Sequence, residues 1–281
     1  MKNVLVAIDF SKTSLNVLDY AVRFAARASA SVTMVWVDNI TSDEMATDGA
    51  VTEIRNEKVE LFKELQNSYE KKINGVKLDF KTKRGKVYVE ICNLARMMNA
   101  DFIFSGTHGV SGFEEFWIGS NAYRIVTHAP CPVISLRLDY AGRELKNIVM
   151  PIDSTQETRQ KIPVTTDLAM AFGAKVHILC LYTTKLKSVQ KRVDNYAIQS
   201  VKYLEDHKIS SVLERVQTDN ITHTTIEYTE DKKADMISIM TEQETTTANL
   251  FLGTYAQQMV YNSPVPIMTV RSRELIEIPV K

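Results

Sequence analysis

The strongest constraint on the fold is that the second half of the chain repeats the first. The segment KNVLVAID at residues 2–9 returns as KNIVMPID at residues 146–153. The next apolar segment, at residues 31–37, returns at residues 175–181 with the same offset of 144. From Lys77 onward the second half follows at an offset of 134 without a gap. This period is far longer than that of a solenoid repeat, so we expect two copies of one domain.

The repeat also predicts the domain boundaries. We expect a first domain at residues 1–138, a linker at 139–145, a second domain at 146–272 and a tail at 273–281. The 281 residues are enough for two domains of ordinary size, each with its own core.

The composition excludes several classes of protein. The 34 basic and 34 acidic residues cancel, so no overall field attracts nucleic acid or an anionic membrane. No apolar run approaches the roughly 20 residues of a membrane span, and the apolar opening stops at Asp9, too early for a signal peptide. Cys92, Cys131 and Cys180 are too widely spaced for a disulfide framework or a zinc site. We expect a soluble, cytoplasmic protein.

Each copy alternates short apolar segments with amphipathic helical segments. In the first copy the expected strands are Val4–Ile8, Val32–Val37, Val76–Thr82, Phe102–Ser105 and Val133–Leu136. Four helices are expected in this copy. The first begins near Ser11–Ser14, and the second follows a loop at Asn39–Ala50 and runs to about Ile73. The third and fourth cover Val87–Met98 and Asn121–Thr127. This pattern predicts an α/β fold with a parallel sheet that helices cover on both faces.

Pro163 falls inside the first helical pattern of the second copy. Proline is tolerated in the first turn of a helix and disrupts its interior. We therefore expect this helix to begin near Pro163.

A glycine-rich segment follows the fourth strand of the first copy. Gly106 and Gly109 come first, and Gly119-Ser120 stands just before the next helix. Glycine tolerates positive φ and has no Cβ, and a helix start presents free N–H groups, so the segment can hold phosphates. A simple turn is the alternative, since no Walker motif and no Gly-x-Gly-x-x-Gly after the first strand occurs. Asp9 ends the first strand and should lie at the same edge of the sheet as Gly106.

These motifs resemble those of the universal stress protein family. Gly106-x-x-Gly109 followed after nine residues by Gly119-Ser120 matches the nucleotide loop of that family. VAIDFS at residues 6–11 is similar to its opening strand, and HAPCPV at residues 128–133 looks like its closing segment. The resemblance covers nearly the whole chain as two tandem domains. It implies a five-stranded parallel sheet in each domain, in a Rossmann-like fold of the adenine nucleotide alpha hydrolase type.

The resemblance further implies an ATP site in the first domain. Asp9 would hold the ribose, Ala7 would line the site and Val37 would contact the adenine. The phosphates would be surrounded by Gly106, Gly109, Gly119, Ser120 and the backbone of Asn121. Glu114 and Glu115 within the loop would repel a triphosphate unless they point outward or recruit Mg²⁺.

The second copy has lost most of this loop. Met240 and Gln243 stand where the first copy has its first two glycines, and only Gly253-Thr254 remains. Their side chains would occupy the space of a phosphate, so we expect no appreciable ATP binding in this half. Three residues of the expected base and ribose site have counterparts: Pro151, Asp153 and Leu181.

Several of these residues also fit a purely structural role. Asp9 fits a cap of the first helix or its turn, and Trp36 and Trp117 fit packing positions. His108 fits a structural or exposed position, because no paired carboxylate or nucleophile is evident from the spacing. We expect no catalytic residues.

The expected function is a nucleotide-binding regulatory or interaction protein of the stress response. One alternative is a slow ATPase or phosphotransferase that uses Ser120, His108 and Mg²⁺. Another is an interaction scaffold without a nucleotide. Pro130 and Pro132 before the last strand fit an edge position, and in the family these last strands pair domains. We therefore expect the two halves to pair, leave open a homodimer, and expect neither nucleic acid nor a membrane as a partner.

Overall fold

The computed structural model describes residues 1–39, 48–72, 75–107, 119–138, 140, 142–241, 243–246 and 249–272. The chain divides into two compact units. One comprises Met1–Glu144 with Met259–Met268, and the other comprises Leu145–Gln258 with Thr269–Lys281. The residue limits expected for the linker and the tail stay predictions.

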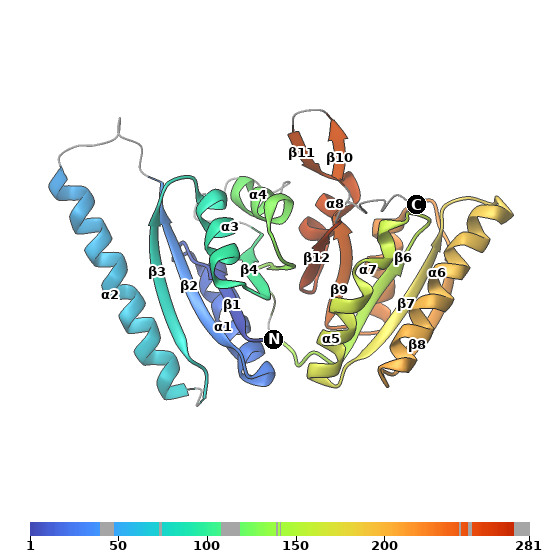
Figure 1. Cartoon of the computed structure of the whole chain (residues 1–281), viewed down its shortest axis with the longest axis horizontal. Coiled ribbons are helices and arrows are strands. Elements are labelled where there is room, and N and C mark those ends of the chain that lie inside the picture. The colour runs from blue at the N-terminus through green and yellow to red at the C-terminus, as the bar shows by residue number, and fades with distance from the viewer. Residues whose placement is uncertain are drawn as a thin grey trace, which may run out of the picture. The chain divides into compact units, whose positions relative to one another are not determined.

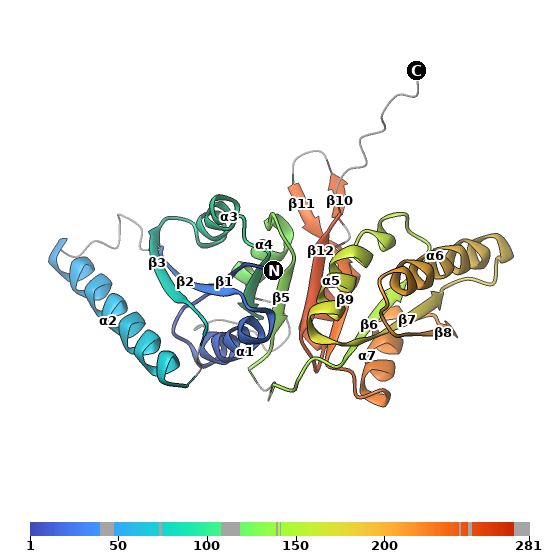
Figure 2. The ribbon, with the colours of Figure 1, turned by 60° about the horizontal axis from the view of Figure 1, so that its bottom comes forward.

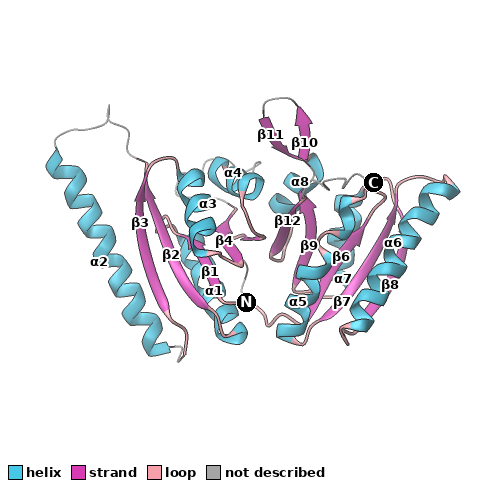
Figure 3. Cartoon of the chain, in the orientation of Figure 1, coloured by secondary structure: helices cyan, strands magenta, loops and turns pink. Residues whose placement is uncertain are grey.

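The first half contains a five-stranded parallel sheet, as expected (Figures 1 and 3). Its elements are β1 (Asn3–Ala7), α1 (Lys12–Ala28), β2 (Ser31–Asp38), α2 (Asp48–Lys72), β3 (Leu78–Arg84), α3 (Val87–Met98), β4 (Phe102–Gly106), α4 (Ser120–His128) and β5 (Val133–Leu136). The strand order is β3-β2-β1-β4-β5, and each neighbouring pair is parallel. The order reverses beside β1, so the carboxyl ends of β1 and β4 flank the place where such sheets bind ligands.

The second half repeats this architecture with additions. Its elements are β6 (Asn147–Ile152), η2 (Glu157–Arg159), α5 (Ile162–Phe172), β7 (Lys175–Tyr182), α6 (Lys187–Asp206), β8 (Ser211–Gln217), α7 (Ile221–Asp231), β9 (Met236–Thr241), β10 (Gln243–Thr246), β11 (Asn249–Leu252), α8 (Thr254–Asn262) and β12 (Ile267–Arg271). The strand order is β12-β9-β6-β7-β8. The β6 strand is parallel to both β7 and β9, and β8 is parallel to β7.

Helices cover both faces of each sheet. Figure 2 shows α1 on one side of the first sheet and α3 on the other, and it shows α5 and α7 on opposite sides of the second sheet. The central strands are consequently buried on both faces; Val4, Leu5 and Val6 of β1 have no exposed surface. Burial of each such apolar side chain contributes about 1.5–3 kcal/mol to folding.

The first helix begins where the hydroxyl residues predicted it. Ser11 is the N-cap of α1, and its side chain accepts a hydrogen bond from the N–H of Ser14 at 3.1 Å. Leu18, Val22 and Ala25 are buried along one face of this helix. A capped start and an apolar stripe at helical spacing are thus both present.

The prediction for Pro163 is confirmed as well. Helix α5 begins at Ile162, so Pro163 lies in its first turn, where the missing N–H costs no helical hydrogen bond. The short 3-10 helix η2 precedes it and occupies the place of the first turns of α1.

The repeat extends to individual hydrogen bonds. Asp101 Oδ2 accepts hydrogen bonds from the backbone N–H groups of Lys2 and Asn3, at 2.5 and 2.9 Å. Asp235 Oδ2 accepts the equivalent two hydrogen bonds, from the residues that open β6, both at 2.9 Å. Equivalent aspartates therefore accept hydrogen bonds from the backbone at the start of the central strand in each half.

The register of the third strand corrects the sequence alignment. Val32 lies opposite Leu78, and the equivalent Val176 lies opposite Ser211, an offset of 133 residues rather than 134. Val4 opposite Phe102 and Ile148 opposite Met236 restore the offset of 134 at the fourth strand. The connection from β8 to α7 is one residue longer than that from β3 to α3, which compensates the shift and hid it from the alignment.

A second difference is the antiparallel hairpin of β10 and β11, in which Gln243 lies opposite Leu252. This hairpin occupies the place in the chain where the first half has its glycine-rich segment, and it was not predicted from the sequence. The sequence places threonine at residues 245 and 246 of β10, and β-branched residues favour extended backbone.

Candidate functional site

A pocket of about 420 Å³ lies at the carboxyl ends of β1, β2 and β4; we call it the first pocket. Seven of the eight residues predicted for a nucleotide site line it: Ala7, Asp9, Val37, Gly106, Gly119, Ser120 and Asn121. The eighth, Gly109, lies outside the described residues, as do His108, Glu114, Glu115 and Trp117. The topology thus brings together residues from separate segments, and their contact with a nucleotide stays a prediction.

Asp9 has a structural role in the turn after β1. Its Oδ1 accepts a hydrogen bond from the N–H of Ser11 at 2.9 Å, and its own N–H donates to Ser14 Oγ at 3.4 Å. The interpretation of Asp9 as a turn cap is therefore confirmed. This role is compatible with ligand binding, because an ionised carboxylate has two oxygens that can each accept more than one hydrogen bond.

The residue after Asp9 has a strained backbone. Phe10 has a φ of +62°, in the left-handed region that residues with a Cβ rarely adopt. Packing holds it there, since its ring lies 4.9 Å from the ring of the fully buried Phe62. Such strain is concentrated at ligand sites and tight turns, and here it borders the first pocket.

The start of α4 forms another wall of the first pocket. Gly119 is the N-cap, with its N–H donating to the carbonyl of Thr107 at 2.9 Å. The carbonyl of Gly119 accepts the N–H of Tyr123, so the N–H groups of Ser120 and Asn121 come before the first N–H that donates within the helix. These N–H groups and the positive end of the helix dipole suit an anion.

The expected reason for the glycines needs correction. Gly119 has φ −57° and ψ 141°, and Gly106 is extended backbone in β4, paired with Leu136. Neither has the positive φ that was expected from the sequence. What these two positions offer instead is backbone without a Cβ on the surface of the pocket.

Several residues of the first pocket were not among those predicted from the sequence. Trp36, interpreted as a packing residue, is half-buried and lines the pocket, as does Asn39 just after β2. Val87 and Ile91 enter from the first turns of α3. The rule that ligands bind at carboxyl ends of strands points to Asn39, whereas no local signal identifies Val87 or Ile91.

Positive charge lies beside the first pocket. A neighbouring hollow of about 430 Å³ shares Asn39, Val87 and Asn121 with it, and its other residues include Arg84, Lys86 and Arg124. The guanidinium of Arg124 lies 5.3 Å from the ring centre of Tyr88. These three cations near the start of α4 favour a polyanion there, which opposes the repulsion expected from the acidic pair in the loop.

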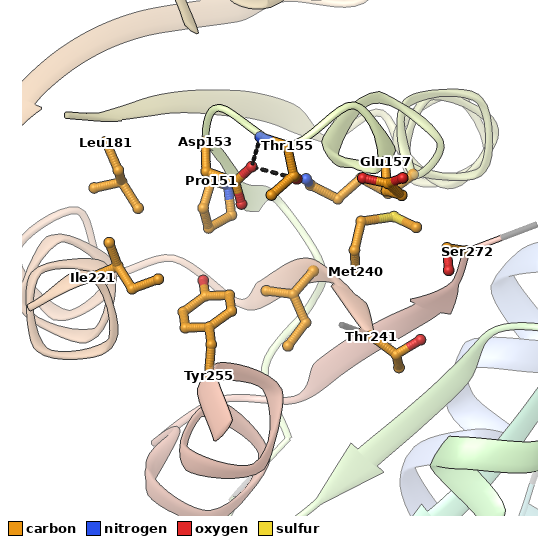
Figure 4. Close-up of a pocket in the computed structure, with 12 residues that line it drawn as sticks. Pro151, Asp153, Thr155, Glu157, Leu181, Ile221, Met240, Thr241, Tyr255 and Ser272 are labelled. Atoms are coloured by element: carbon orange, nitrogen blue, oxygen red, sulfur yellow. Dashed lines mark hydrogen bonds between the residues drawn. The ribbon is translucent and has the colours of Figure 1, made fainter. Parts of the chain in front are cut away.

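The second half has a smaller pocket at the equivalent place, of about 280 Å³; we call it the second pocket (Figure 4). Pro151, Asp153 and Leu181 line it, as the repeat predicts. Asp153 Oδ1 accepts hydrogen bonds from the N–H and the hydroxyl of Thr155, at 2.8 and 2.5 Å, which are the dashed lines in Figure 4. Met240 lines the second pocket where the first pocket has Gly106.

Three further features concern thiol reactivity, metal binding and membrane insertion. Burial raises the pKa of the Cys131 thiol to about 12, so this cysteine is not a reactive thiolate at neutral pH. Within the described residues, no group of three or more histidine, cysteine, aspartate or glutamate side chains could hold a metal ion. Over the same part of the chain, no helix is both long and apolar enough to cross a membrane.

Comparison with known proteins identifies the fold and the family. The universal stress protein family matches the chain twice, at residues 1–137 and 144–271. A Staphylococcus aureus (strain USA300) protein assigned to this family is 32% identical over 166 residues, which cover 57% of this chain and 96% of that protein. A relative from Staphylococcus epidermidis gives the same values.

Solved structures share the fold over nearly the whole length of the chain. A universal stress protein from Archaeoglobus fulgidus has a TM-score of 0.78 at 19% identity, with 97% of each chain covered. A protein assigned to the same family from Pseudomonas aeruginosa UCBPP-PA14 has a TM-score of 0.62 at 12% identity, covering 97% of this chain and 94% of that one. The structural matches support the fold, and the two family matches cover both halves. The chain therefore belongs to the universal stress protein family, with two tandem copies of its domain.

Proposed function

We propose that the first pocket binds an adenine nucleotide, ATP, and that the chain is a regulatory or interaction protein of the stress response without fast catalysis. The observation that carries the proposal is the convergence of strand ends and a helix start on one pocket. Asp9 comes from the end of β1, Val37 from β2, Gly106 from β4, and Gly119 and Ser120 from the start of α4.

The two ends of the first pocket suit the two ends of ATP. Val37 and Ile91 provide an apolar wall for a flat base, and Asp9 provides a carboxylate for ribose hydroxyls. The start of α4, with Arg84 and Arg124 in the adjoining hollow, suits the phosphates. Mg²⁺ would arrive bound to those phosphates, because this ion is commonly held by phosphate oxygens and few protein ligands.

We propose that the second half is a companion that does not bind ATP, and that the protein works in the cytoplasm. The three cysteines are free thiols, the state that a reducing compartment maintains. Pairing of the two halves through their last strands, and a homodimer of whole chains, stay predictions. Light scattering coupled to size exclusion, with and without ATP, measures the homodimer directly.

The decisive experiment mixes the full chain with ATP and Mg²⁺ and follows binding by calorimetry and phosphate release by a colour assay. The test variant is Gly119→Ala, and the matched control is Gly253→Ala, the same substitution at the repeated position. We expect saturable binding that weakens roughly tenfold in Gly119→Ala only, because the added methyl group crowds the phosphates. Circular dichroism checks that both variants fold.

Three outcomes separate the candidate functions. Saturable binding with negligible phosphate release supports the regulatory protein. The absence of binding at millimolar ATP would favour a scaffold that uses no nucleotide. Phosphate release that is lost in Ser120→Ala would favour the slow enzyme instead.

Melting curves supply an independent measure. A ligand at about 100 times its dissociation constant adds roughly 2.7 kcal/mol to the free energy of unfolding of the unit that binds it. We expect ATP to raise only the transition that belongs to the first half.

A further inference from the structure

The second pocket contains a buried lysine that the repeat does not require. Lys161 directly precedes α5, is only 2% exposed and lines the second pocket. Its Nζ donates hydrogen bonds to the carbonyl oxygen and to Oγ1 of Thr158, at 2.7 and 3.0 Å. An ammonium group has three donors, so one remains beyond these two neutral acceptors.

The charge of Lys161 lacks a close counter-ion within the chain. Across the described residues, no carboxylate lies within ion-pair distance of its Nζ. Burial lowers the pKa of Lys161 to about 8, and the more distant charge of Asp153 opposes that shift. Lys161 is thus mostly protonated at pH 7, and a buried ammonium without a paired anion is costly.

The position in the fold increases this cost. Lys161 is the N-cap residue of α5, a helix of 11 residues, so its charge lies at the positive end of the helix dipole. The equivalent residue of the first half is Val17, which has no exposed surface. An apolar side chain is therefore compatible with the fold at this position. The fold does not require a lysine here, which suggests that Lys161 has a role in binding.

The rest of the second pocket limits what could pair with this charge. Pro151, Leu181 and Ile221 give it an apolar wall, and Figure 4 shows the Tyr255 ring reaching from α8 toward the same space. Asp153 and Glu157 add two negative charges to its lining, which disfavour a triphosphate or another polyanion. The volume of about 280 Å³ suits a small molecule.

We infer that the second pocket binds a small monocarboxylate with an apolar body, whose carboxylate pairs with the ammonium of Lys161. The apolar body lies against Pro151, Leu181 and Ile221, and the positive end of the α5 dipole favours the carboxylate. The inference is independent of ATP binding, because every residue that it uses belongs to the second half.

The test uses the full chain without ATP and two probes of the same shape, benzoate and the uncharged benzamide. Heteronuclear NMR and calorimetry measure their dissociation constants. We expect benzoate to bind saturably and at least tenfold more tightly than benzamide, since a hydrogen bond to a charged group is worth enough to produce that factor. Phenylacetate and hexanoate extend the series to other apolar bodies.

Lys161→Met removes the charge and keeps an unbranched apolar side chain, and Lys202→Met is the matched control on the exposed surface of α6. We expect the preference for benzoate over benzamide to vanish in the first variant and to persist in the second. Absence of saturable binding for all three carboxylates, or an unchanged preference in Lys161→Met, would overturn the inference.

A second measurement needs no variant. An anion beside Lys161 raises its pKa above about 8, so binding of benzoate at pH 8.5 should be accompanied by proton uptake. Asp153 and Glu157 are the other charged groups of the pocket, and Tyr255 is its remaining titratable side chain. Calorimetry in buffers of different ionisation enthalpy measures the uptake, and binding without it would contradict the pairing with Lys161.

Discussion

The two halves of this protein share one fold and carry different chemistry at the same place. The first pocket has Gly106 at the end of β4 and α4 starting beside it, whereas the second pocket has Met240 in place of the glycine and is also lined by the buried Lys161. The central strand pairs β1–β2 and β6–β7 nevertheless keep the same register: Asn3 lies opposite Ser31, and the equivalent Asn147 lies opposite Lys175. A duplicated domain can therefore keep its core while its ligand site changes, because the fold depends on the buried strands and the site on residues at their ends.

The largest effect should come from exchanging the buried residues at the matched positions. Val17→Lys places a charge in a fully buried position of the first half, and we expect a loss of about 3–5 kcal/mol in the free energy of unfolding. Lys161→Met should stabilise the second half by about 1 kcal/mol, because it removes a buried charge. Denaturant titration measures the free energy of unfolding of both variants. If Lys161→Met destabilised the protein as much as Val17→Lys, Lys161 would be required for stability.

The next effect concerns the glycine that the second half has replaced. Gly106→Met copies Met240 into the first pocket, and overpacking there should weaken ATP binding by roughly a hundredfold. The reverse change, Met240→Gly, should leave the second half without ATP binding, since the β10–β11 hairpin remains in place of the glycine segment. If Met240→Gly made the second half bind ATP, the difference in ATP binding between the halves would be due to this one side chain.

A smaller effect separates the two equivalent carboxylates. Asp9→Ala and Asp153→Ala each remove a hydrogen bond to the backbone N–H two residues onward, so each should lower the free energy of unfolding by about 1 kcal/mol. Only Asp9→Ala should also weaken ATP binding, by roughly tenfold. Calorimetry with ATP on both variants makes the comparison, and an equal loss would imply that both halves bind the nucleotide.

The smallest effect is a difference in acid sensitivity. His177 of β7 is buried, and its pKa is lowered, first by burial and then by Lys175 and Lys232, against an opposing contribution from Glu214. The equivalent residue of the first half is Thr33. A histidine with a lowered pKa takes up its proton more readily when unfolded, so the stability of the second half is complete above about pH 6.5 and falls as the pH drops below it.

The variant His177→Thr should remove this part of the acid sensitivity. The neutral imidazole lies 3.2 Å from Tyr228 Oη and 3.3 Å from Asn147 Oδ1, so the substitution also lowers stability at every pH. The informative quantity is therefore the slope of unfolding free energy between pH 7 and 5.5, measured by denaturant titration. An unchanged slope would assign the acid sensitivity to other groups.

Much of the fold could be predicted because its signals are local and occur twice. The strand Val133–Leu136 and the helix Val87–Met98 have the limits expected from sequence, and Pro163 correctly indicated a late start for α5. The alignment of the third strands, β3 and β8, was wrong by one residue. The connection after β8 is one residue longer than the connection after β3, and this extra residue hid the shift. The β10–β11 hairpin was missed, because it departs from the copy on which the expectation was based.

The predicted site divides in the same way. Asp9 and Gly106 could be brought together in advance, because strand ends in a parallel sheet meet at one edge. Val87 and Ile91 reach the first pocket from α3, and their placement depends on how that helix packs on the sheet. The φ of Gly119 also differs from the expected one, since its conformation is set by the cap of α4 and its hydrogen bond to Thr107.

The sequence by itself determined that the chain has two copies of an α/β domain, that a glycine segment survives in one of them, and that the motifs are those of one family. Only the tertiary structure decided that Lys161 is buried and lines the second pocket, whereas its counterpart Val17 belongs to the hydrophobic core of the first half. The physical reason is that periodicity reports which face of an element is apolar. The cost of a charge depends on the groups around it, and the pocket that Lys161 lines is formed by residues of η2, β6, β7, α7, β9 and α8 together.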